Sequence, residues 1–163
     1  MAITRKLPSS VRLGLPLALA VLAVDQLSKL WLLGLVGPYE AIRLLPFFNL
    51  VMVWNTGVSF GMLGGAELGP WPFVALSALI TAGLLVWLWR LEGRLLAAAV
   101  GAVIGGAVGN MVDRVVYGAV ADFFDFHLMG YHWPAFNVAD AAIVVGVALI
   151  ILEAFLGQRR REG

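Results

Sequence analysis

Four long apolar stretches divide the chain, and each is close to the length of a membrane-spanning helix. They cover residues 13–36, 71–89, 95–117 and 136–157. A helix needs about 20 largely apolar residues to cross the hydrocarbon core of a bilayer. The pattern therefore predicts a mainly α-helical membrane protein with four transmembrane helices.

The two longer connections differ in pattern from the short one between the second and third stretches. Residues 37–70 contain FFNLVMVWNTGVSFGML, which combines β-branched and aromatic residues with Gly57 and Gly61. This combination favours strands joined by a turn. Residues 118–135 form a shorter connection that includes ADFFDFH. We expect a small β-containing loop region on the membrane surface, on the side that these two connections share.

The distribution of basic residues predicts the orientation of the helices, because cytoplasmic loops carry an excess of Lys and Arg. On one side lie Arg5, Lys6 and Arg12, Arg90 and Arg94, and Arg159, Arg160 and Arg161. The other side has Arg43, with Arg114 near the end of the third stretch. Both termini are therefore expected in the cytoplasm and residues 37–70 and 118–135 outside. A cleaved signal peptide ending near Ala18–Ala20 is the alternative, but the apolar run continues past those residues.

Composition places the chain among integral membrane proteins. Its 163 residues are 61% hydrophobic and 13% charged, with a mean hydropathy of +0.93, against about 45–50% apolar and 25% charged residues in soluble domains. We expect one domain over residues 1–163. The absence of cysteine excludes disulfides, thiolate metal sites and a cysteine nucleophile. Two histidines are too few for a His-rich metal site, and a net charge of +1 gives no reason to expect a nucleic-acid partner.

Apart from Glu153, the polar residues that could act within the spans gather near their outer ends. At about 1.5 Å per residue, Asp25 lies about 18 Å from the cytoplasmic start of the first helix, and Lys29 about 6 Å further. The other polar residues near the outer ends are Asn110, Asp113 and Arg114 in the third stretch, Asp122 just after it, and Asn137 and Asp140 at the start of the fourth. Ionisable groups at membrane depth cost at least about 2.5–3.5 kcal/mol each and mark functional sites. The sequence therefore predicts a functional layer on the outer side.

Some of these residues also have a purely structural interpretation. Asp25 and Lys29 can form an ion pair that locks two helices, as can Asp113 with Arg114 and a neighbour. Both interpretations remain open at the level of sequence.

Other polar residues have similarly plain explanations. Asn137 with Asp140 fits a helix N-cap followed by an acidic residue in the first turn. Asp125 has no bounding motif or partner and is interpreted as a solvated loop carboxylate. His127 and His132 are interpreted as residues of the membrane interface.

Two aspartates offer the most direct chemistry for the outer layer. The chain has no GxSxG motif, and Ser59 has no evident base nearby in sequence. Like charges held close cannot both ionise, so a carboxyl pair retains one proton and can act as base and acid on a single water. Asp122 lies in an outer connection and Asp140 begins a helix, so the two can face each other at the membrane surface.

Five ordered blocks carry a resemblance to a known family. They are DQLSK at Asp25–Lys29, NTGVSFG at Asn55–Gly61, GNMVDR at Gly109–Arg114, VADFFDF at Val120–Phe126 and PAFNVADAAI at Pro134–Ile143. Together with the four spans, they make the whole chain resemble lipoprotein signal peptidase, the bacterial signal peptidase II.

The resemblance implies an aspartic endopeptidase of the bacterial inner membrane with its active site toward the outer face. Its substrate would be a prolipoprotein bearing a diacylglyceryl group on cysteine, cut just before that cysteine. Asp122 and Asp140 match the family's catalytic aspartates. The matching supporting positions are Asn110, Asp113, Arg114, Asn137, Asn55, Gly57, Asp25 and Lys29. No metal or organic cofactor is implied, the surroundings would be membrane lipid, and we expect a monomer.

Two other classes of function compete with this hypothesis. A small transporter or channel would carry polar groups through the inner half of the membrane, where the sequence has almost none. A structural membrane subunit would use the ion pairs to hold helices together, and Asp122 would then be dispensable.

Overall fold

The computed structural model describes residues 7–37, 40–57 and 69–162. Its helices are α1 (Ser9–Leu35), α2 (Trp71–Arg90), α3 (Arg94–Tyr117) and α4 (Val138–Glu162). Its strands are β1 (Ala41–Leu45), β2 (Phe48–Asn55), β3 (Val120–Leu128) and β4 (Tyr131–His132). Within the described ranges, four helices are long and apolar enough to cross a membrane, and they coincide with the four predicted stretches to within a few residues.

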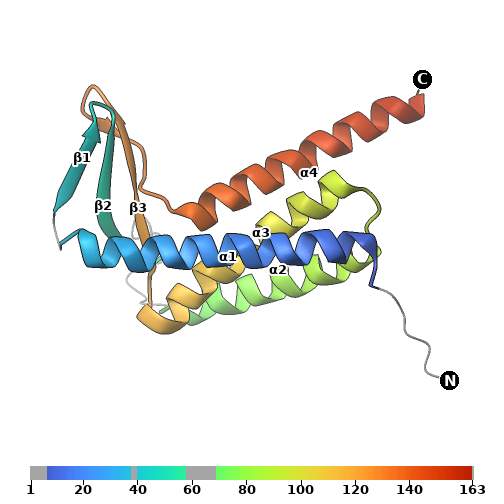
Figure 1. Cartoon of the computed structure of the whole chain (residues 1–163), viewed down its shortest axis with the longest axis horizontal. Coiled ribbons are helices and arrows are strands. Elements are labelled where there is room, and N and C mark those ends of the chain that lie inside the picture. The colour runs from blue at the N-terminus through green and yellow to red at the C-terminus, as the bar shows by residue number, and fades with distance from the viewer. Residues whose placement is uncertain (1–6, 38–39, 58–68, 163) are drawn as a thin grey trace.

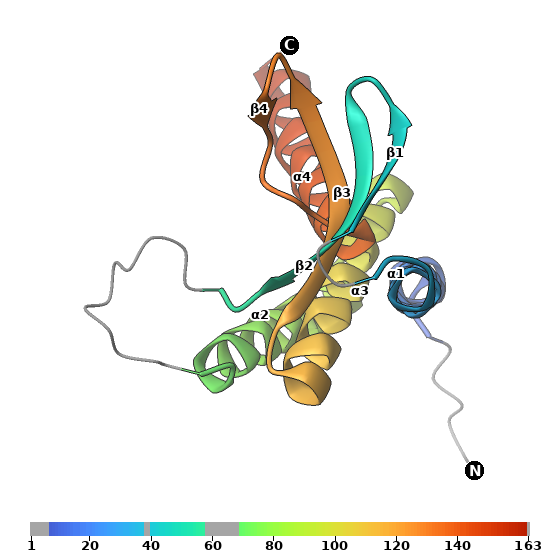
Figure 2. The same cartoon turned by 90° about the vertical axis from the view of Figure 1, so that its left-hand side faces the viewer.

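Helix α3 is the centre of the bundle and contacts each of the other three helices (Figure 2). In the most apolar 18-residue segment of α3, 61% of the residues are buried. The corresponding share is 22% in α1 and 11% in each of α2 and α4. Small residues allow this close packing: side chains added at Gly101 or Gly105 would collide with α1, and one at Gly106 would collide with α4. Small residues at such spacing let helix backbones approach each other in membranes.

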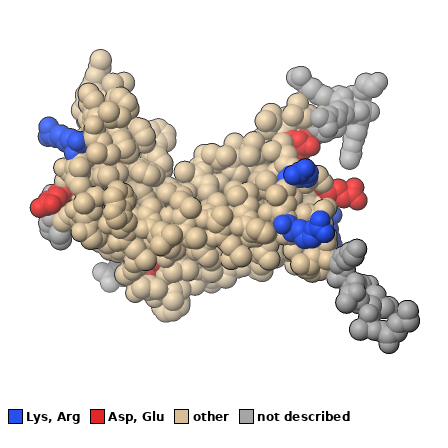
Figure 3. Space-filling view, in the orientation of Figure 1, with Lys and Arg blue, Asp and Glu red and all other residues tan. Residues whose placement is uncertain are grey.

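The surfaces of the helices that face away from α3 are apolar. Leu27, Leu79 and Val144 are examples of large side chains that are mostly exposed on the bundle. The charged side chains lie mainly at the two ends of the molecule, with uncharged surface between them (Figure 3). This distribution suits a bundle whose middle is surrounded by lipid tails.

A four-stranded antiparallel sheet in the order β1-β2-β3-β4 stands at one end of the bundle (Figure 1). Leu32 of α1 and Val36, directly after α1, pack against Leu50 and Phe123 of the sheet. The register of β2 against β3 shifts between Leu50 and Val53, and such bulges bend a strand and increase its twist.

Strand β3 was not foreseen. The sequence predicts strands only within residues 37–70 and a connection over residues 118–135, whereas β3 follows α3 almost directly and pairs along β2. The α3 helix ends at Tyr117, and the C-cap residue that follows, Gly118, has a φ of 76° and hence a left-handed conformation. The chain can therefore turn sharply from α3 into the sheet.

Candidate active site

Asp122 and Asp140 lie at the junction between the sheet and the bundle, and Asn137 links them. Asp122 is in the first part of β3, and Asp140 is in the first turn of α4. The side-chain amide of Asn137 donates to Asp122 Oδ1 at 2.6 Å. Its backbone nitrogen donates to Asp140 Oδ2 at 3.2 Å. The structure thus brings together the two predicted aspartates.

The second oxygen of each carboxylate is also held by an asparagine. Asn55, at the end of β2, donates through Nδ2 to Asp122 Oδ2 at 3.0 Å. Asn110, in α3, donates through Nδ2 to Asp140 Oδ1 at 2.8 Å. The two aspartates are therefore positioned by groups from β2, α3 and α4.

Gly57 fixes the orientation of Asn55. Its backbone nitrogen donates to Asn55 Oδ1 at 2.8 Å, so the amide of Asn55 is left to face Asp122. Gly57 has a φ of 79°, and a Cβ there would lie 3.0 Å from the ring of Phe73. A residue with a side chain would be both strained and crowded at this position.

The helix-cap interpretation of Asn137 and Asp140 is confirmed. The backbone N–H of Asp140 donates to Asn137 Oδ1 at 2.9 Å, and the backbone N–H of Asn137 donates to Asp140 Oδ2 at 3.2 Å. This reciprocal pair is a capping box. It leaves Asp140 Oδ1 directed at Asn110, so capping does not exclude a chemical role.

A buried charge cluster lies beside the aspartates. Lys29 contacts Asp25 Oδ2 at 2.7 Å and Asp113 Oδ2 at 2.8 Å. All three side chains are at most 3% exposed. The Asp25–Lys29 pair is present, but the interpretation that Asp113 forms an ion pair with Arg114 and a neighbour is wrong with respect to Arg114, because Asp113 pairs with Lys29. Adjacent residues on a helix do not face each other, and Asp113 points toward α1.

Arg114 instead packs at the side of the bundle that faces α2. Its Nη1 donates to the backbone oxygen of Asn110 at 3.3 Å, and its guanidinium lies 5.3 Å from the ring centroid of Phe73. Its buried Nε has no hydrogen-bond partner among the described residues. Asp140, Asp122 and Asp113 are the carboxylates that interact with its charge.

The environment of Asp122 favours its protonated form. Burial raises its pKa to about 6, and the nearby charge of Asp140 acts in the same direction. The hydrogen bonds from Asn55 and Asn137 and the charge of Lys29 oppose this effect only in part. Such a carboxyl can both hold and release a proton near neutral pH, as acid–base catalysis requires.

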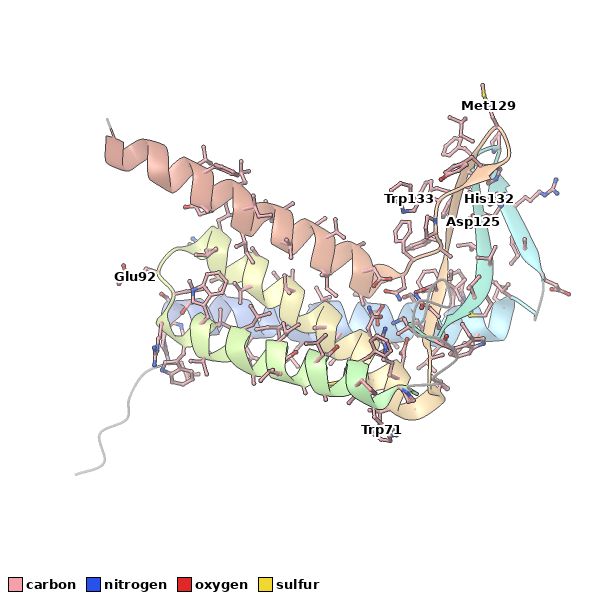
Figure 4. The ribbon with its side chains drawn as sticks, turned by 180° about the vertical axis from the view of Figure 1, so that it is seen from behind. Trp71, Glu92, Asp125, Met129, His132 and Trp133 are labelled. Atoms are coloured by element: carbon pink, nitrogen blue, oxygen red, sulfur yellow. The ribbon has the colours of Figure 1, made fainter. Side chains whose placement is uncertain are left out.

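Asp125 is not a solvated loop carboxylate, contrary to the expectation from sequence. It is 7% exposed within β3 and accepts hydrogen bonds from Asn49 at 2.8 Å and His132 at 2.7 Å. Burial acts to raise its pKa, but these hydrogen bonds, together with the electrostatic effect of His132 and His127, outweigh burial and lower the pKa. Asp125 and His132 lie in the sheet (Figure 4), and His127 stacks on His132 with ring centroids 4.9 Å apart.

Two residues that were not predicted, Gln26 and Gly109, also contact the buried charge cluster. Gln26 donates through Nε2 to Asp113 Oδ1 at 2.9 Å and to Asp25 Oδ2 at 3.2 Å. Gly109 leaves room for Asp25, since a Cβ there would lie 2.6 Å from Asp25 Oδ2. An amide side chain in an apolar stretch, next to Asp25, was the available signal for Gln26. Ser59 and Gly61 lie outside the described residues.

No group of three His, Asp or Glu side chains that could hold a metal ion occurs in the described part of the chain. The site consists instead of two carboxyl groups, amides that orient them, and a buried charge cluster. This arrangement can abstract a proton from a water on one carboxylate and deliver a proton from the other.

Comparison with known proteins identifies the family. A family model described as signal peptidase (SPase) II matches residues 17–156. A lipoprotein signal peptidase of Methylorubrum extorquens is 49% identical over 90% of this chain and 87% of its own length. That of Beijerinckia indica is 44% identical, over 86% of each chain. A bacterial membrane enzyme solved at 2.3 Å is similar with a TM-score of 0.79 and 28% identity, over 92% of this chain and 91% of its own. The resemblance predicted from the five blocks is confirmed: the chain belongs to the signal peptidase II family and is a multi-pass membrane protease.

Proposed function

We propose that the protein is an aspartic endopeptidase that removes signal peptides from diacylglyceryl-modified prolipoproteins, cleaving before the lipidated cysteine. Family membership supports the reaction and the substrate class. The assignment of Asp122 and Asp140 rests on one observation: Asn137 donates a hydrogen bond to each of the two carboxylates. In this proposal these two residues are catalytic, and no metal takes part.

The mechanism uses one proton shared by the two carboxyl groups. The ionised aspartate takes a proton from a water as that water attacks the carbonyl carbon before the cysteine. The protonated aspartate supports the developing oxyanion, and a proton then passes to the departing amine of the cysteine. The pKa of Asp122, raised to about 6, supports a carboxyl group that takes up and releases a proton at mildly acidic to neutral pH. Because water is the nucleophile, no acyl-enzyme forms.

Supporting roles follow from the contacts. Asn55, Asn110 and Asn137 orient the carboxylates, and Gly57 orients Asn55. Asp25, Lys29 and Asp113 form the buried cluster beside the dyad. Arg114 adds a positive charge near both aspartates.

The proposed location is the bacterial inner membrane, with both termini in the cytoplasm and the active site at the outer leaflet. The dyad lies at the sheet end of the bundle. Trp71 lies at the same end, and Glu92 in the connection between α2 and α3 at the opposite end (Figure 4). Arg12, Arg90 and Arg94 belong to that opposite end by their positions in the helices, which supports a cytoplasmic assignment for it. A diacylated cysteine would rest at the level of the dyad while its signal helix spans the bilayer.

A monomer suffices for this mechanism, because one chain supplies both aspartates and every group found to hydrogen-bond to them among the described residues. No observation favours a transporter or a purely structural subunit. Asp122 and Asp140, the asparagines that bind them and the buried charge cluster all lie toward one end of the bundle. A transport path would continue toward the other end.

The direct test uses purified protein and a synthetic precursor whose cysteine carries a diacylglyceryl group. Mass spectrometry should detect a product that begins at the lipidated cysteine, and in ¹⁸O-water the label should enter the signal peptide's new carboxyl group. The same precursor without lipid is the control and should be cut poorly. Failure of the folded wild-type protein to cleave the lipidated precursor would refute the proposed function.

A further inference from the structure

Lys29 is connected to the backbone immediately before each aspartate of the dyad. Its Nζ contacts Asp25 Oδ2 at 2.7 Å and Asp113 Oδ2 at 2.8 Å. Asp25 Oδ1 accepts the backbone N–H of Ala139 at 2.9 Å, and Asp113 Oδ2 accepts that of Ala121 at 3.2 Å. Ala139 directly precedes Asp140, and Ala121 directly precedes Asp122.

We propose that Lys29 is a positioning residue that sets the separation of Asp122 and Asp140 through its two carboxylate arms, Asp25 and Asp113. This inference rests on the proposed function, since it assumes that the two aspartates are the catalytic pair. It assigns the buried cluster a role beyond holding helices together.

The contacts reach further than a helix lock requires. An ion pair that only joined α1 to α3 would need Lys29 and Asp113 alone. Here one arm extends from α1 to the first turn of α4, and the other from α3 to the start of β3. The ammonium group is therefore the common point of the two elements that carry the dyad.

Lys29 also contributes to the orientation of Asn110, together with Asn137, which donates to Asn110 Oδ1 at 3.1 Å. Its Nζ donates to Asn110 Oδ1 at 3.2 Å, and an ammonium group has donors but no acceptor. The oxygen of the Asn110 amide must therefore face Lys29, which directs the NH₂ group to Asp140 Oδ1 at 2.8 Å. Lys29 thus acts on Asp140 by two routes, through Asp25 and through Asn110.

The remaining groups of the cluster fit the same role. Gln26 donates to Asp113 Oδ1 at 2.9 Å, so both oxygens of that arm are engaged. Gly109 makes the approach of Asp25 to α3 possible, because a Cβ there would lie 2.6 Å from its Oδ2. The charged groups near the dyad are Asp25 and Lys29 from α1, and Asp113 and Arg114 from α3.

The test compares Lys29→Met and Asp113→Asn in the full-length protein, with kcat, KM and the pH range of activity as readouts. Lys29→Met should lower kcat by about tenfold or more, because misplacement of catalytic groups acts on the transition state. KM should stay within about twofold. Loss of a nearby cation should shift activity to higher pH, since Lys29 favours the ionised form of Asp122. Asp113→Asn removes an anion and should lower kcat with a shift to lower pH.

Ser10→Ala is the matched control. Ser10 is a buried polar residue of the same helix, 4% exposed, and its hydroxyl has no partner among the described residues. It lies near the start of α1, far along the helix from Lys29. Its loss should leave kcat and the pH range at wild-type values.

Unchanged kcat and pH range in folded Lys29→Met would overturn the inference, even if its thermal stability were lower, because the cluster would then only hold helices together. If Lys29→Met does not fold, the nearly isosteric Asp113→Asn decides: an unchanged kcat and pH range overturns the inference, and the predicted changes support it. A wild-type protein that does not cleave the lipidated precursor would refute the proposed function instead. Cleavage by wild type and by Lys29→Met at equal rates refutes only the positioning role.

Discussion

Asn137 and Asp122 are joined by a 2.6 Å hydrogen bond from Nδ2 to Oδ1. The same asparagine caps α4 through its Oδ1, which accepts the backbone N–H of Asp140 at 2.9 Å. One side chain therefore holds the start of α4 and one carboxylate of the dyad. Its two functions can be separated by substitution.

We expect Asn137→Ser to keep the helix cap but to lose the bond to Asp122, because a serine side chain is too short to reach both groups. Serine and asparagine are similar as N-caps. Thermal stability should fall, because the buried amide that also donates to Ala121 O and Asn110 Oδ1 is lost, and kcat should fall by a factor on the order of 10², as for other misplaced catalytic groups. Asn137→Ala should show the same loss of kcat and, in addition, about 1 kcal/mol lower stability. Full activity in Asn137→Ser would show that the bond to Asp122 is not needed.

Asp122→Asn and Asp140→Asn should each abolish most of the cleavage of a lipidated precursor. An amide cannot exchange a proton as a carboxyl does, and general acid–base groups contribute about 10²–10⁴-fold to rate. Both variants should still insert into the membrane and bind substrate, which can be measured by chromatography and equilibrium binding.

Asp125→Asn is the control for these two variants. Asp125 lies in the same strand as Asp122 and is also buried, but its partners are Asn49 and His132. Its substitution should leave the rate per folded molecule near wild type, although stability should fall because two hydrogen bonds are weakened. Rapid cleavage by either well-folded dyad variant would remove Asp122 and Asp140 from the catalytic role.

Local sequence was sufficient to predict the helices and the cap of α4. Twenty or so consecutive apolar residues specify a spanning helix wherever they occur, and Asn137 with Asp140 is a cap motif within one turn. The Asp25–Lys29 pair is equally local, since the residues are one helical turn apart.

Contacts between distant segments were beyond the reach of local pattern. Strand β3 was not predicted for this reason: its partner strand is β2, and α2 and α3 separate the two strands in sequence. Asp113 was paired with its neighbour Arg114, whereas its partner Lys29 belongs to α1. Asp125 was left without partners because Asn49 reaches it only across the sheet. Each error replaced a tertiary partner by a near neighbour in sequence or by solvent.

The raised pKa of Asp122 predicts a pH dependence of stability. The folded state binds the proton more tightly than the unfolded chain, whose carboxyl has a pKa of 3.8 against about 6 in the structure. This contribution is fully present below pH 3.8 and is lost as pH rises through about 6, with an upper limit of about 3 kcal/mol. Asp122→Asn cannot ionise at this position, so its stability, measured by thermal unfolding, should decline less than that of the wild type between about pH 4 and 6. An identical decline in both proteins would contradict this assignment of the pKa.

Gly109→Ala should displace Asp25 and thereby lower both stability and activity. The new methyl group would lie 2.6 Å from Asp25 Oδ2, whose carboxylate is already held by Lys29 and by the backbone N–H of Ala139. Overpacking of this kind costs about 1–3 kcal/mol, and the shift should reach Asp140 through Ala139. Gly83→Ala in α2 is the matched control, since a Cβ there meets nothing within 4 Å; it should be neutral or stabilising by up to about 1 kcal/mol. Thermal unfolding and kcat for both variants measure the effect. Equal behaviour of the two would show that Asp25 can move without consequence for the dyad.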